Sequence, residues 1–73
     1  MNKHFDRFNE SELDKLNCMN YMVHNPDGHY YITDGIDGLK VFATNNKIDV
    51  YELCENLLDM GQVELDKISI TMV

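Results

Sequence analysis

The sequence predicts a small single α+β domain in which helices cover one face of an antiparallel sheet. Two segments carry helix start signals followed by apolar residues at helical spacing, and the segments between and after them alternate with a period of two. A length of 73 residues suffices for one domain only. The predicted order is α-β-β-β-α-β over residues 1–73. Because each helix has one apolar stripe, we expect both helices on the same face of the sheet.

The first helix is predicted to begin after Asn9. This side chain can accept a hydrogen bond from the backbone N–H of Glu12, and the Glu12 side chain can reach back to the Asn9 N–H, as in a capping box. Phe8 before the cap and Leu13 after it have the spacing of a hydrophobic staple. We therefore expect a helix from about Glu10 to near Asn17 or Met19.

Continuation of this helix through Val23 is an alternative, because Leu16, Met19 and Val23 share one helical face. An Asn-Pro pair would then end the helix. We favour a β-hairpin over the longer helix, since Tyr21 and Val23 fit a period of two and the turn sequence Pro-Asp-Gly follows them.

The hairpin is expected to join strands 21–24 and 29–33 through a type I turn that Pro26 presets, with Gly28 as a left-handed bulge residue. The predicted pairs are Asn25 with His29, His24 with Tyr30, Val23 with Tyr31, and Met22 with Ile32. One face would carry Met22, His24, Tyr30 and Ile32, and the other Tyr21, Val23, Tyr31 and Thr33. This pattern does not decide which face the helices cover. Either open face carries aromatic rings, which favours a homodimer contact or a partner surface.

Three further elements complete the predicted fold. A third strand is expected over Leu39–Thr44 after a loop at 34–38, and a final alternating strand over Lys67–Met72. Between them, the second helix is predicted to run over Val50–Met60 with Gly61 as its left-handed C-cap. It begins with the same signals as the first helix, with Asp49 and Glu52 as a capping box and Ile48 and Leu53 as a staple.

Acidic residues dominate the second helix and the segment after it. Six lie between residues 48 and 66 with no Lys, Arg or His among them, and the chain carries a net charge of −7. Asp49 and Glu52 have a structural role at the start of the helix. No capping role explains the other four, which are Glu55, Asp59, Glu64 and Asp66. We expect them to form a surface for a basic protein, whereas direct binding to nucleic acid or to an anionic membrane is disfavoured.

No enzymatic site, metal or cofactor is expected. The histidines and cysteines lack the spacing of a zinc site, and the predicted register places His24 and His29 on opposite faces of the hairpin. Cys54 falls on the apolar side of its helix, where a thiol is protonated and inert. With neither an apolar leader nor an apolar run of 18 residues, the sequence predicts a protein of the reducing cytoplasm.

Two function classes follow from these patterns. The first is a non-enzymatic inhibitor that docks on a basic surface of a nucleic-acid-handling protein. In size, charge and layout the chain is similar to small acidic inhibitors, including anti-CRISPR and anti-restriction DNA mimics of phages and mobile elements. The second is a structural or regulatory module that acts through self-association or through aromatic contacts at Tyr21, Tyr31 and Phe42.

Overall fold

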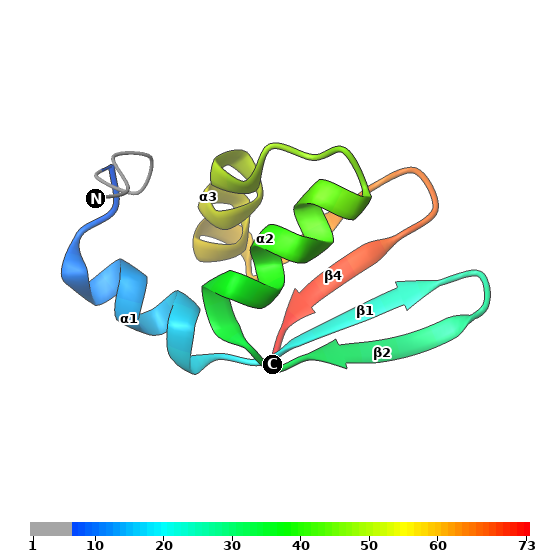
Figure 1. The fold of residues 1–73 in the computed structure, drawn as a ribbon, viewed down its shortest axis with the longest axis horizontal. Helices are drawn as coiled ribbons and strands as arrows, with labels where there is room; N and C mark the ends of the chain where they lie inside the picture. Colours follow the sequence, from blue (N-terminus) through cyan, green and yellow to red (C-terminus); the bar gives the residue numbers. More distant parts are fainter. Residues whose placement is uncertain (1–6) are drawn as a thin grey trace.

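The computed structural model describes residues 7–73 as three helices on one face of a four-stranded antiparallel sheet (Figure 1). The elements are α1 Glu10–Cys18, β1 Tyr21–Asn25, β2 Gly28–Ile32, α2 Gly35–Asn45, α3 Val50–Met60, β3 Gln62–Glu64 and β4 Ser69–Met72. The strands lie in the order β2-β1-β4-β3, so β2 and β3 form the edges. The predicted α+β class and the one-sided helical layer are confirmed, whereas the predicted order is wrong: the observed order is α-β-β-α-α-β-β.

Helix α1 begins with the predicted capping box. The Glu12 N–H donates to Asn9 Oδ1 at 2.8 Å, and the Asn9 N–H donates to Glu12 Oε1 at 2.9 Å. The helix ends at Cys18, and Met19 is already extended, with φ of −88° and ψ of 153°. The alternative of a helix continuing through Val23 is therefore wrong, because that residue lies in the middle of β1.

The β1–β2 hairpin forms, but its register differs from the prediction by one residue. Asn25 pairs with Gly28, and His24 pairs with His29. The Asn25 side chain accepts from the Asp27 N–H at 2.9 Å, which stabilises a turn of only two residues, Pro26 and Asp27. Gly28 is thus a paired strand residue rather than an unpaired bulge. Every residue of β2 consequently faces a different neighbour from the predicted one.

The predicted third strand is a helix. Residues 39–44 lie inside α2, whose buried positions Gly35, Leu39, Phe42 and Ala43 recur at helical spacing. In a strand, Val41 would share a face with the buried Leu39, but it is 60% exposed. The segment with two glycines before it is the first turn of the helix rather than a loop. Gly38 lies where a side chain would collide with Ile32. Close helix-to-strand packing therefore requires glycine at this position.

Helix α3 has the predicted bounds, and its C-cap Gly61 is left-handed with φ of 73°. Its N-cap differs in detail from the prediction. The Asp49 side chain accepts a hydrogen bond from the Tyr51 N–H at 2.9 Å, whereas a capping box would use the Glu52 N–H as the donor. The helix therefore has an N-cap without the predicted capping box. Strand β3, which was not predicted, follows Gly61 and pairs with β4. β4 itself begins at Ser69 rather than at Lys67.

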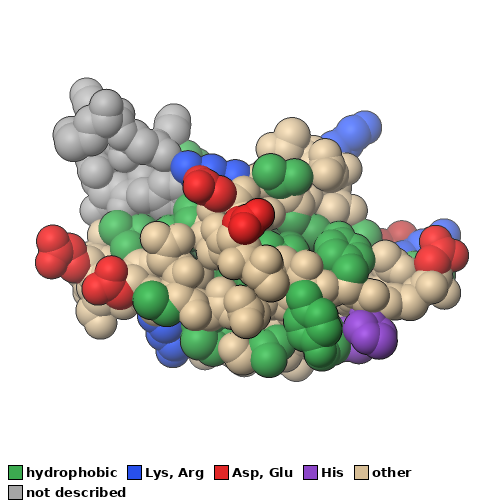
Figure 2. Space-filling model, turned by 60° about the horizontal axis from the view of Figure 1, so that its bottom comes forward, with side chains coloured by type: hydrophobic (Ala, Val, Ile, Leu, Met, Phe, Trp, Pro, Cys, Tyr) green, Lys and Arg blue, Asp and Glu red, His purple; other side chains and the backbone are tan. Residues whose placement is uncertain are grey.

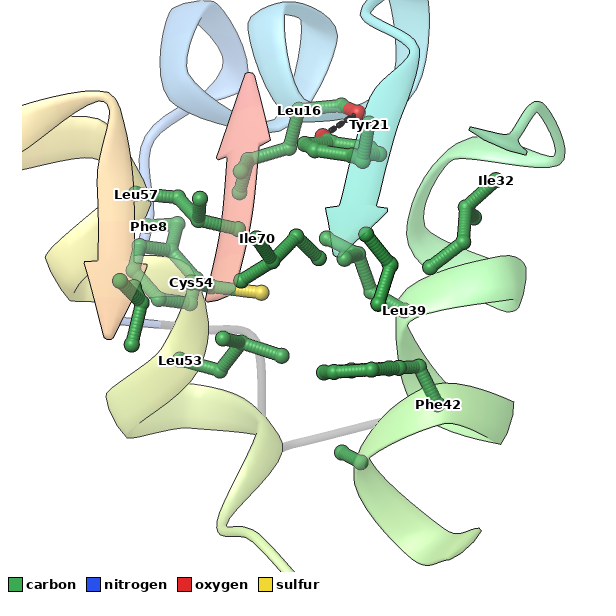
Figure 3. Close-up of a cluster of buried hydrophobic side chains, with 13 residues drawn as sticks. Phe8, Leu16, Tyr21, Ile32, Leu39, Phe42, Leu53, Cys54, Leu57 and Ile70 are labelled. Carbon is green, nitrogen blue, oxygen red and sulfur yellow. Dashed lines mark hydrogen bonds between the residues drawn. The ribbon is translucent and has the colours of Figure 1, made fainter. Parts of the chain in front are cut away.

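One hydrophobic core lies between the helical layer and the sheet, and no polar or charged residue is among the buried residues of 7–73. Figure 3 shows side chains from all three helices meeting those of the sheet. The labelled residues are Phe8, Leu16, Tyr21, Ile32, Leu39, Phe42, Leu53, Cys54, Leu57 and Ile70. The covered face of β1 therefore carries Tyr21 and Val23, and its other face carries Met22 and His24.

Candidate functional site

Helix α3 presents a row of carboxylates away from the core. Leu53, Cys54 and Leu57 are buried beneath it. Glu52, Glu55 and Asp59 are exposed, and their spacing of three and four residues places them on one side of the helix. We call these three residues the α3 acidic stripe.

Arg7 partly neutralises this stripe. Its Nη1 lies 3.2 Å from Glu55 Oε1, and its guanidinium carbon lies 5.1 Å from the ring centroid of Tyr51. Both charged side chains of the ion pair are about half exposed, at 52% and 54%, so the pair contributes little to stability. The acids of α3 therefore have one neighbouring cation, Arg7, although residues 48–66 contain no Lys, Arg or His. Arg7 is 48 residues from Glu55, and no local sequence signal links them.

A shallow hollow of about 150 Å³ joins α3 to the start of α1. Glu12, Glu55 and Asp59 line it together with Arg7, Phe8 and Leu58. Within residues 7–73, no cation lies within ion-pair distance of Asp59. Three carboxylates and one guanidinium give this hollow a net negative charge, and its size suits a single cationic side chain better than a substrate.

Glu64 and Asp66 lie in a different place from the stripe. They line a groove of about 480 Å³ between the tip of the β1–β2 hairpin and the β3–β4 loop. Its other lining residues are His24, Asn25, Pro26, Leu65, Lys67, Ile68 and Ser69. Lys67 lies beside these acids, so the groove has both signs of charge. The four predicted partner-binding acids therefore form two separate pairs, one on α3 and one at the hairpin tips.

The open face of the sheet carries little charge. Its first row across the strands is His29, His24, Ser69 and Glu64, and its second row is Tyr31, Met22, Thr71 and Gln62. Figure 2, with the lower side of Figure 1 turned forward, shows hydrophobic side chains and a histidine along the lower part of the view. Glu64 is the one acidic residue in these two rows.

Two of the predicted aromatic contacts are wrong. Tyr21 is fully buried and its hydroxyl donates to the carbonyl of Leu16, as Figure 3 shows. Burial raises the pKa of this phenol well above its ordinary value of 10.0. Phe42 is 3% exposed, because residues 39–44 form a helix whose apolar side faces the core. Tyr31 is on the open face and 54% exposed, so it remains available to a partner.

Three of the five exposed large hydrophobic residues in the described part of the chain lie at the β2 edge. Tyr30 and Tyr31 of β2 and Val41 of the adjacent helix α2 are each at least 45% exposed. A hollow of about 310 Å³ lies between this strand and α2, lined in part by Tyr31, Ile32 and Val41. Strand β2, with the sequence Gly-His-Tyr-Tyr-Ile, contains no proline and no Asp, Glu, Lys or Arg. This edge therefore lacks the charges that normally prevent one edge strand from pairing with another.

The buried thiol of Cys54 is not activated for nucleophilic chemistry. Burial raises the pKa of the Cys54 thiol to about 11, and the positive charge of Lys40 offsets only part of that rise. Cys54 is thus protonated at neutral pH, as expected. Among residues 7–73, no three His, Cys, Asp or Glu side chains are grouped to hold a metal ion. His4 lies outside the described residues.

No family model matches this chain, and searches of curated proteins and of solved structures found no match either. Within the described range, no helix is long and apolar enough to cross a bilayer. The surfaces described above are therefore the basis for assigning a function.

Proposed function

We propose that this protein is a non-enzymatic inhibitor whose α3 acidic stripe docks on a basic, nucleic-acid-binding surface of another protein. The observation that carries the proposal is the row of Glu52, Glu55 and Asp59 on the outer side of α3, with Arg7 as its one ion-paired cation among the described residues. Glu52 lies in the first turn of α3, where a carboxylate stabilises the helix. Glu55 and Asp59 lie beyond that turn, and like charges three or four residues apart destabilise a helix slightly, so these two have no helix-stabilising role.

The spacing of these carboxylates supports a resemblance to a phosphate backbone. At 1.5 Å of rise per residue, Glu52, Glu55 and Asp59 follow one another along the helix axis at about 4.5 and 6 Å. The phosphates of one DNA strand advance about 3.4 Å per nucleotide along the duplex axis, which is a similar scale. A groove of Lys and Arg side chains shaped for phosphates would attract such a row through long-range electrostatics.

The net charge of −7 favours a basic partner over nucleic acid itself. Glu64 and Asp66 lie at the hairpin tips, away from the hollow that contains Glu55 and Asp59. We assign them a secondary role, as a second contact for a partner large enough to reach both pairs.

Competition with DNA tests this function. The tagged protein is used to capture partners from its source cells at low and high salt, and the recovered partner is mixed with labelled DNA and increasing protein. We expect the wild type to displace the DNA and the Glu55→Gln/Asp59→Asn variant to do so much less well. A matched control, Asp14→Asn/Asp27→Asn, changes the net charge equally at exposed positions outside the hollow. Equal displacement by all three proteins, or none by the wild type, contradicts the proposal.

A second candidate function is self-association through the β2 edge, and the exposed Tyr30, Tyr31 and Val41 favour it. The occupant is a second copy of the chain, because two copies of charge −7 repel least where the contacting strands carry no charge. Antiparallel pairing of two β2 strands about a two-fold axis at Tyr30 would place His29 of each copy opposite Tyr31 of the other.

Light scattering over a range of concentrations tests this pairing. We expect a dimer that persists at high salt, and a monomer for Tyr31→Lys, which adds charge at the edge. Met60→Lys is the matched control, because Met60 is 67% exposed but lies on α3. A wild type that stays monomeric at every concentration contradicts self-association.

A further inference from the structure

The two histidines of the hairpin form a cross-strand pair on the open face of the sheet. His24 of β1 lies directly opposite His29 of β2, and their ring centroids are 5.6 Å apart with an interplanar angle of 49°. Both side chains are exposed. The one-residue difference in register creates this pair, since the predicted register placed the two rings on opposite faces.

Neither imidazole makes a hydrogen bond to any of residues 7–73, so the ring nitrogens of both remain available to a ligand. His29 also contacts Tyr31 edge-on, at 6.3 Å between centroids and 88° between planes. His24 also borders the groove that Glu64, Asp66 and Lys67 line, so two carboxylates and one ammonium group lie on that side of the pair.

The separation of the rings suits one shared metal ion. An imidazole nitrogen coordinates zinc at about 2.0–2.1 Å, which places the ring centroid about 3 Å from the ion. Two rings on one ion at a tetrahedral or wider angle are then roughly 5–6 Å apart, as they are here. Since no third side chain is grouped with the pair in the described chain, water would complete the coordination.

We propose that His24 and His29 form a two-histidine site for a divalent transition metal of the Zn²⁺, Ni²⁺ or Cu²⁺ type. Imidazole is a preferred ligand of these ions, whereas Ca²⁺ and Mg²⁺ prefer oxygen. A bound ion joins β1 to β2 and stabilises the folded hairpin, because the unfolded chain does not hold the two rings together. This site is independent of the α3 acidic stripe and does not rest on the proposed function.

Zinc titration of the full chain tests the site by calorimetry and by the NMR signals of the histidine rings. Every protein carries Cys18→Ser, because Cys18 is an exposed thiol that could bind zinc by itself. We expect one Zn²⁺ per chain, ring signals of both His24 and His29 that shift together, and a melting temperature that rises with zinc. His24→Ala and His29→Ala should each weaken binding roughly tenfold or more, because the second ligand binds at high effective concentration.

The double variant His29→Tyr/Tyr31→His is a control of identical composition. It keeps two histidines on the same face but places the second opposite Met22, diagonal to His24. We expect it to bind zinc as weakly as the single variants do. Zinc binding of wild-type strength in all three variants overturns the proposal. So does a wild-type titration in which the two ring signals do not shift, or in which Ca²⁺ shifts them equally; this measurement does not depend on whether any variant folds.

Discussion

The Tyr21 ring is fully buried, and its hydroxyl donates to the Leu16 carbonyl near the C-terminal end of α1. The carbonyl is one of those that an α-helix leaves without an intrahelical partner at its end. Tyr21→Phe keeps the ring but removes the donor, so we expect a loss of about 1–2 kcal/mol in the free energy of unfolding. Urea denaturation measures the loss. Tyr31→Phe is the control, and its exposed hydroxyl should matter little; equal stabilities for the wild type and Tyr21→Phe would contradict the role of this bond.

Cys54 makes stability depend on alkaline pH. Burial raises its pKa from 9.0 in the unfolded chain to about 11, so the thiol stays protonated in the folded state while the unfolded chain loses the proton. The contribution of this thiol to the stability of the folded state is complete below pH 9 and is lost as the pH rises toward 11. Between pH 9 and 10 this group alone should lower the free energy of unfolding by about 1 kcal/mol.

Urea denaturation at pH 8, 9 and 10, with reductant present, measures this dependence. For Cys54→Ala, we expect the free energy of unfolding to decrease less between pH 9 and 10 than it does for the wild type, by about 1 kcal/mol. Cys18→Ala removes a thiol that is exposed at the end of α1 and should keep the steep dependence. An unchanged pH dependence in Cys54→Ala would show that other groups cause the alkaline loss.

At the scale of elements, α2 depends on a glycine for its contact with β2. Replacing Gly38 by alanine raises intrinsic helix propensity by about 1 kcal/mol. It also places a methyl group against the Ile32 side chain, which is largely buried and has little room to move. Overpacking of this kind costs roughly 1–3 kcal/mol, so we expect Gly38→Ala to be destabilising despite its helix propensity.

Thermal denaturation of Gly38→Ala compared with Thr44→Ala measures this balance. Thr44 is exposed on the same helix, and its replacement should be neutral or slightly stabilising, since propensity alone acts there. A Gly38→Ala protein that melts at a higher temperature than the wild type would contradict this expectation, because α2 and β2 could then move apart slightly at no cost in stability.

The elements predicted correctly are those with local start and stop signals. The Asn9 capping box and the left-handed Gly61 set the limits of α1 and α3 within the sequence itself. The prediction of a strand over residues 39–44 was wrong because Val41 and Phe42 have high strand propensity. In the structure these residues form a helix, which buries Leu39 and Phe42 against the sheet. Strand β3 spans only three residues and depends on pairing with β4, so it has no distinct pattern of its own.

The hairpin register could not be predicted from residue types, because a two-residue turn and a three-residue turn with a bulge both suit Asn-Pro-Asp-Gly. The Asn25 side chain decides for the shorter turn by accepting from the Asp27 N–H. This one-residue difference determines which histidines and tyrosines are neighbours. Much of the chemistry of the open face was therefore outside what sequence alone could establish.

At the scale of the whole molecule, the charges lie mainly on the helices and loops, and the open sheet face carries few. The acidic character of α3 was predictable from its sequence. The contact between Arg7 and Glu55 was not, because tertiary packing brings together residues 48 positions apart. Nor could sequence show that Glu64 and Asp66 lie at the hairpin tips beside Lys67. Of the four predicted acids, Glu55 and Asp59 therefore lie in the α3 acidic stripe, and Glu64 and Asp66 lie in a groove of mixed charge.

The salt dependence of binding to the captured partner tests the docking role of the α3 acidic stripe most directly. Dissociation constants are measured between about 0.05 and 0.5 M NaCl, a range over which exposed charges become screened. For the wild type we predict binding that weakens steeply with salt. Glu55→Gln/Asp59→Asn should bind more weakly at low salt and depend less on salt, and Asp14→Asn/Asp27→Asn should behave like the wild type. Wild-type affinity that does not change with salt, or a stripe variant indistinguishable from the wild type, would contradict an electrostatic docking surface on α3.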